Sequence, residues 1–331
     1  MSCPVRNIIS NGVYLHNRII LNIKKMIIES IKEGFRLTHK NWHVVLLNIG
    51  VGIINLINFF VIVGIPIVIG LFSLGIDIAQ AKALLPEILE NPSEFFLKYL
   101  GAAILIFVAF IIYLAVASIL ILYVFGGTLS MLRNTVVNRQ YSFSLSSFFS
   151  EARKVFFSML NLFSVAFLAI IAILIVFGIS AGILISIVSA YDGIATTVSV
   201  FTTYFFILLG VTVVLVSIIF TAYTAIVLVV EKNRVTDSFR NAWNFIKNKP
   251  MAFVFYIILI IGIVAVNLLL IVLGASFGAA PIIGYIFLIP HWLISYVVQS
   301  YLGVVMWSSL IIYYIKATNY PAYPTAPTYD I

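Results

Sequence analysis

The chain has 331 residues, of which 63% are hydrophobic and only 9% are charged, and its mean hydropathy is +1.17. Soluble domains carry about 25% charged residues, so lipid is the predicted solvent for most of this chain. The formal net charge is +8, and the single cysteine, Cys3, excludes both an intrachain disulfide and a cysteine-based metal site.

The chain begins with a basic segment over residues 1–28, followed by six uncharged apolar runs. Each run has the roughly 20 residues that a helix needs to cross the hydrocarbon core, and backbone groups in lipid must bond within their own helix. We expect Pro66 to kink or end the first span and Pro290 to lie in the first turn of the sixth. The predicted spans are residues 44–73, 99–127, 158–188, 199–230, 251–274 and 286–315.

Lysine and arginine are distributed unevenly between the two sides of these spans. Seventeen of the 19 lie before the first span or after the second, fourth or sixth, and only Lys82 and Lys98 lie on the other side. This positive-inside pattern predicts an integral protein of the plasma membrane with both termini in the cytoplasm. The net charge is therefore assigned to topology and to anionic lipid headgroups, and nucleic acid is not an expected partner.

Three amphipathic segments lead into spans one, three and five, at residues 29–42, 145–158 and 237–250. Their apolar residues recur with helical spacing and their basic residues lie on the opposite face, which is typical of helices in the membrane interface. In the third segment the expected apolar stripe is Phe239, Ala242, Trp243 and Ile246. In each segment a bulky apolar residue precedes a small one by three positions, in the pairs Ile31/Gly34, Phe149/Ala152 and Phe239/Ala242.

These segments predict an all-α polytopic transmembrane bundle of six spans with three cytoplasmic interfacial helices. The bundle forms one domain over residues 29–316, built from three repeats of an interfacial helix and a hairpin over about 29–128, 145–231 and 237–316. An alternative is that such loops are amphipathic for insertion and topology alone. A cytoplasmic tail rich in proline and tyrosine, residues 317–331, follows the bundle.

A helix of the form S-F-R-N-A-W-x-x-x-K ahead of a span resembles the membrane domain of the glycerophosphoryl diester phosphodiesterases. It is also similar to related six-span proteins of archaea and bacteria. In that family the membrane domain is attached to a soluble catalytic barrel, and no part of this chain could form one, so the resemblance implies a membrane module without phosphodiesterase activity. It rests on Ser238, Arg240, Ala242, Trp243 and Lys247, and more weakly on Ser30, Lys32, Phe35 and Lys40.

The sequence offers few residues that could form a catalytic or metal-binding site. No acidic residue lies inside a span, and no protease, hydrolase or phosphate-loop motif is present, so we expect neither an enzyme nor a cofactor or metal site. We predict instead a surface that docks on the membrane or a protein partner. Its residues are Lys32, Arg36, Arg153, Lys154, Arg240, Trp243 and Lys247.

Two further sets of residues are candidates for function. A polar seam between spans is predicted from Asn48, Asn55, His291, Ser295 and Gln299, with ordinary interhelical packing as the alternative. The tail contains Pro324, Thr325, Ala326 and Pro327, a PTAP tetrapeptide that resembles motifs recruiting membrane-scission machinery.

We therefore expect a non-catalytic scaffold or accessory subunit that contacts anionic headgroups and a protein partner on the cytoplasmic face. The alternative is a permease-type component that moves a lipid or apolar solute with a separate ATPase.

Overall fold

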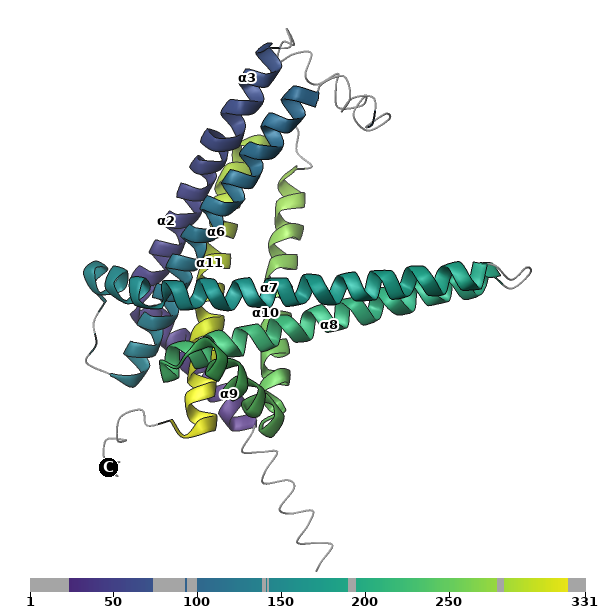
Figure 1. Cartoon of the computed structure of the whole chain (residues 1–331). Helices are drawn as coiled ribbons and strands as arrows, with labels where there is room; N and C mark the ends of the chain where they lie inside the picture. Colours follow the sequence, from purple (N-terminus) through teal and green to yellow (C-terminus); the bar gives the residue numbers. More distant parts are fainter. Residues whose placement is uncertain are drawn as a thin grey trace, which may run out of the picture. The chain divides into compact units, whose positions relative to one another are not determined.

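The structure is a computed structural model that describes residues 24–73, 93, 100–138, 141, 143–189, 195–278 and 283–320 (Figure 1). The described residues form helices and short connections, and none of them lies in a strand. Six helices are long and apolar enough to cross a membrane, which confirms the six predicted runs and is compatible with a multi-pass membrane protein. These candidate spans are Trp42–Gly70, Leu100–Val137, Leu145–Ile187, Val198–Glu231, Met251–Ser276 and Phe287–Thr318.

Three helices are much longer than a bilayer requires. Helices α6 (Leu100–Val137), α7 (Leu145–Ser189) and α8 (Ala195–Glu231) have 38, 45 and 37 residues. At 1.5 Å per residue α7 is about 68 Å long, whereas the hydrocarbon core is about 30 Å thick. A substantial part of α7 is therefore available to pack outside the hydrocarbon region.

The first span is interrupted without being ended. Helix α2 (Trp42–Phe59) passes through a π-helical turn, η1 (Phe60–Gly64), into α3 (Ile65–Ser73), and the amide of Ile65 donates to the carbonyl of Phe60. Pro66 lies just after this turn, and a proline removes one backbone donor and clashes with the preceding turn. The wider π-turn accommodates it, so the helix continues beyond Pro66.

The prediction that Pro290 lies in the first turn of its helix is wrong. Helix α11 (Ile283–Thr318) begins seven residues earlier, and Pro290 is in its interior. Transmembrane helices tolerate such a proline because neighbouring groups satisfy the freed backbone carbonyl.

The chain divides into two compact units, one over Val45–Phe125 and one formed by Met1–Val44 with Gly126–Ile331. Within the first unit the rings of Phe59 and Tyr113 meet edge to face with centroids 5.3 Å apart. Within the second, α7 pairs with α8, and α10 (Met251–Gly278) pairs with α11 (Figure 1). The predicted single domain with three repeats remains a prediction.

The three amphipathic segments differ in where they end. The first is a helix over residues 24–40 that stops at a turn on Asn41, and the third is α9 (Val235–Asn248), which stops before Pro250. The second has no boundary at residue 158, because α7 runs from Leu145 straight into the span. No glycine or proline interrupts residues 145–177, so nothing in the local sequence breaks the helix there.

The core of the second unit lies towards the ends of these helices that carry the basic residues, which we call the basic end. Fully buried side chains gather on the last turns of α6, α8 and α11, and on the first turns of α7 and α10. Tyr223, for example, is completely buried, and its hydroxyl donates to the carbonyl of Ala252 at 2.7 Å. The basic end is thus a packed structure that can hold side chains in defined positions.

Candidate functional site

The predicted docking residues, which we call the basic surface, are all exposed. They lie on three helices: Lys32 and Arg36 on the helix over residues 24–40, Arg153 and Lys154 on α7, and Arg240, Trp243 and Lys247 on α9. Lys154 forms an ion pair with Glu151 of the same helix, with its Nζ 2.6 Å from Glu151 Oε1. The other charges are presented outwards from the basic end.

Each of these helices is anchored by the small residue of its predicted pair. Gly34, Ala152 and Ala242 are buried, and so are the residues one turn before them, Ser30, Phe148 and Ser238. A small residue allows two helix backbones to approach closely. The small positions therefore mark the packed face of each helix.

The helix over residues 24–40 packs on α11. A Cβ added to Gly34 would lie 3.0 Å from the backbone nitrogen of Ser309, and the buried hydroxyls of Thr38 and Ser308 form a hydrogen bond of 3.1 Å. At the surface, Lys316 Nζ lies 3.0 Å from Glu33 Oε1. Close backbone contact and matched polar groups hold this helix on the bundle.

The N-terminal part of α7 packs on a double glycine in α6. A Cβ on Gly127 would lie 2.7 Å from Phe148 Cζ and 3.0 Å from Ala152 Cβ. Phe148 is fully buried whereas Phe149, the bulky member of the predicted pair, is 48% exposed. Of the predicted pair, Ala152 lies on the packed face, and its bulky neighbour there is Phe148 instead of Phe149.

The buried face of helix α9 also differs from the predicted apolar stripe, with which it shares Ala242. Its buried residues are Ser238, Ala242 and Phe245, whereas Trp243 is 60% exposed. Phe245 packs on Tyr314 of α11 with ring centroids 4.8 Å apart. The Trp243 ring meets that of Phe220 edge to face, with centroids 6.2 Å apart, and much of its surface stays exposed.

A carboxylate at the end of α8 connects three elements. Glu231 accepts hydrogen bonds from Asn233 at 2.7 Å, from Asn241 of α9 at 2.8 Å and from the hydroxyl of Tyr314 of α11. Hydrogen bonds to an ionised group are stronger than neutral ones. This network fixes α9 against the ends of α8 and α11.

A small polar pocket lies where α6, α7 and α8 come together at the basic end. Its volume is about 170 Å³. It is lined by Ser130, Arg133, Asn134, Glu151, Lys154, Val155, Ser158, Leu228, Val229, Lys232 and Asn233. Only Lys154 belongs to both this pocket and the basic surface.

The residues of the predicted polar seam are divided between the two compact units, and the seam stays a prediction. His291 Nε2 lies 2.9 Å from the carbonyl oxygen of Leu270 and 3.5 Å from Ser295 Oγ, while Gln299 is exposed. His291 thus joins α11 to α10, which fits the packing alternative. Asn48 and Asn55 belong to the other compact unit. The tail residues Pro324, Thr325, Ala326 and Pro327 lie outside the described residues.

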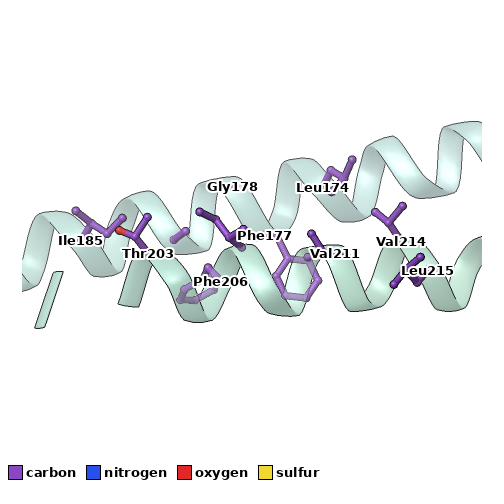
Figure 2. A pocket seen from close by; sticks show the side chains of 12 residues that line it. Leu174, Phe177, Gly178, Ile185, Thr203, Phe206, Val211, Val214 and Leu215 are labelled. Atoms are coloured by element: carbon purple, nitrogen blue, oxygen red, sulfur yellow. The ribbon is translucent and has the colours of Figure 1, made fainter. Parts of the chain in front are cut away.

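An apolar groove of about 440 Å³ runs between α7 and α8. Figure 2 shows Phe177 of α7 reaching across towards α8, where its ring centroid lies 6.5 Å from that of Phe206. Gly178 and Gly210 also line the groove, and a Cβ on either would meet nothing within 4 Å. The groove is open enough to hold an apolar molecule at the depth of the membrane spans.

Sequence reasoning missed the polar groups on which the basic end depends. Glu231 was available as a signal, because it directly follows the apolar run of span four, whereas Ser130 and Arg133 lie beyond the predicted end of span two. Asn267 in α10 was also missed, although its Oδ1 is buried without a hydrogen-bond partner.

In the part of the chain that the structure describes, no three histidine, cysteine or acidic side chains lie close enough to hold a metal ion. Comparison with protein-family models, with curated proteins and with solved structures finds no match. The likeness to the phosphodiesterase membrane domain therefore stays a prediction that rests on the quoted residues.

Proposed function

We propose that this chain is a membrane-embedded scaffold or accessory subunit without a catalytic site of its own. Its basic surface faces the cytoplasm at the plasma membrane and receives anionic headgroups and a protein partner. One observation carries the proposal: the seven residues of the basic surface are exposed, while the helices that present them are anchored by buried small residues.

Anchoring matters because binding requires the loss of side-chain and segmental freedom. A helix already held against the bundle loses less conformational entropy on docking than a loose cytoplasmic loop does. Exposed charges also speed encounter with an acidic partner and set its orientation. Trp243, exposed beside Arg240 and Lys247 on α9, supplies the apolar contact that such a surface otherwise lacks.

The test is affinity purification of the full chain from its native membranes, with identification of the bound proteins and lipids. The variant Arg240→Glu with Lys247→Glu should lose most of the recovered partner. A matched control, Lys24→Glu with Lys25→Glu, reverses two exposed charges outside the basic surface and should retain it. Equal recovery from the two variants would refute a docking role for α9.

The orientation can be tested with the single cysteine of the chain. Cys3 lies in the predicted cytoplasmic N-terminal segment. A membrane-impermeant maleimide should label it only after intact cells are permeabilised. Labelling of intact cells would place the N-terminus outside and remove the basis for a cytoplasmic docking surface.

A second candidate function, a permease-type component for a lipid or apolar solute, is favoured by the groove between α7 and α8. Because the groove lies at the depth of the membrane spans, the molecule bound in it would be an acyl chain. Gly178→Leu and Gly210→Leu should fill the groove, since both positions face open space. If the chain is a permease, these variants should lose lipid or solute transport and an ATPase should co-purify. If it is a scaffold, partner recovery should be unchanged.

A further inference from the structure

The polar pocket between α6, α7 and α8 is lined by residues whose polar atoms are not all satisfied by internal hydrogen bonds. At about 170 Å³ it greatly exceeds the roughly 10–15 Å³ that a single water needs. It lies at the basic end, beside the last turns of α6 and α8 and a turn on α7. Two of its polar atoms are buried without a partner, and both are potential donors.

The first is the hydroxyl of Ser130. This residue is only 3% exposed, and its Oγ has no hydrogen-bond partner. Hydroxyls in helices usually bond back to the carbonyl four residues earlier, as Thr135 of the same helix does to Met131 at 3.0 Å. A buried polar group without a partner is costly, and Ser130 lines the pocket, so rotation of its side chain would let the hydroxyl donate to a molecule bound there.

The second is the Nε of Arg133. Its two terminal nitrogens are used, Nη1 towards Asn134 Oδ1 at 2.9 Å and Nη2 towards the carbonyl of Val230 at 3.4 Å. These two bonds orient the guanidinium between α6 and α8. The Nε–H is buried and has no partner, so this donor of an oriented cation is unused.

The charge of the pocket favours an anion. Arg133, Lys154 and Lys232 line it together with one carboxylate, Glu151. Glu151 is already paired with Lys154 at 2.6 Å. Lys232 follows the end of α8 with φ of 55°, a left-handed conformation that ends the helix and leads into the lining residue Asn233. The residues that line the pocket therefore carry two more positive charges than negative ones.

We propose that this pocket binds a phosphate group, either in the headgroup of an anionic phospholipid or as a free phosphate. Arg133 Nε and Ser130 Oγ donate to its oxygens, and Arg133 and Lys232, the two lining cations that Glu151 does not pair, balance its charge. A phosphate suits the pocket because it accepts hydrogen bonds in several directions, and planar guanidinium groups recognise it well. The site is separate from partner docking on α9 and does not depend on it.

The experiment uses the full chain, purified in mild detergent and stripped of bound lipid. It is titrated with dihexanoylphosphatidylglycerol and, in a separate arm, with inorganic phosphate, and binding is measured by calorimetry. We expect Arg133→Gln to weaken binding by at least about tenfold and Ser130→Ala by several-fold, as for lost hydrogen bonds to a charged group. Tighter binding of the lipid identifies a headgroup site, and tighter binding of inorganic phosphate identifies a site for the free ion.

Arg234→Gln is the matched control. It removes an equal charge close in sequence to Lys232, but Arg234 is exposed and does not line the pocket, so binding should be retained. Ser130→Ala keeps the test valid if Arg133→Gln does not fold, because deleting an unpaired buried hydroxyl should not destabilise the helix. If neither probe binds, or if both pocket variants bind like the unaltered chain, the pocket is not a phosphate site.

Discussion

Replacing Gly34 by alanine should destabilise the contact between the helix over residues 24–40 and α11. An added Cβ would overlap Ser309 Oγ and would lie 3.0 Å from the Ser309 backbone nitrogen and 3.1 Å from its Cα. Rotation of the serine side chain relieves only the first of these overlaps. The helix must therefore move away from α11, which also strains the buried hydrogen bond between Thr38 and Ser308.

The magnitude follows from opposing effects at Gly34. Alanine is favoured over glycine inside a helix by about 0.5–1 kcal/mol. Overpacking costs about 1–3 kcal/mol, and loss of the Thr38–Ser308 bond costs about 1 kcal/mol. We expect a net loss of about 1–3 kcal/mol in the free energy of unfolding.

The assay is unfolding of the purified chain in mixed micelles with increasing sodium dodecyl sulfate, followed by circular dichroism. Gly303→Ala is the control, since it lies on α11 with no atom within 4 Å of an added Cβ, and should be neutral or stabilising. In a Ser309→Ala background Gly34→Ala should cost less, because the nearest overlapping atom is gone. If Gly34→Ala matched Gly303→Ala, the close approach of these helices would be refuted.

Three other substitutions test the basic end in the same assay. Tyr223→Phe should cost about 1–3 kcal/mol, because it leaves the carbonyl of Ala252 without its buried donor. Gly127→Val should cost more than about 1 kcal/mol, because its Cβ would overlap Phe148. Lys316→Gln should cost less than about 1 kcal/mol and should have no effect in high salt, because its ion pairs are partly exposed.

Matched changes at open positions are the controls for these predictions. Tyr204 is 69% exposed, so Tyr204→Phe should be neutral. Gly262→Val places a side chain where nothing lies within 4 Å, and should be better tolerated than Gly127→Val. A large, salt-independent loss for Lys316→Gln would contradict the weak role given to its ion pairs.

The spans were predictable because their signal is local, whereas the packed faces were not. Within α9, helical spacing indicated a stripe containing Trp243, yet the buried residues are Ser238, Ala242 and Phe245. Hydrophobicity ranks tryptophan above serine, but close helix packing favours the smaller residue and leaves the amphipathic ring at the surface. At the start of α7, Phe148 is buried and Phe149 is exposed, and residue type cannot decide between two phenylalanines; the direction in which α6 packs on α7 does.

The candidate sites were predictable in part. The residues of the basic surface were chosen for their charge and position, and the structure finds them exposed, while docking on them stays a prediction. The pocket around Ser130 and Arg133 was missed because nothing in residues 130–133 shows that a hydroxyl lacks a partner. That property depends on what α7 and α8 place around it.

The sequence by itself determined that the chain is helical and has six helices able to cross a membrane. The reason is that membrane insertion depends on windows of about 20 residues, and backbone groups in lipid are satisfied within each helix. Only the tertiary structure decided which residues meet at the basic end. Thr38 and Ser308 are 270 residues apart in the chain, and their contact depends on the packing of whole helices. The same packing leaves Ser130 and Arg133 with the unused donors on which the proposed phosphate site rests.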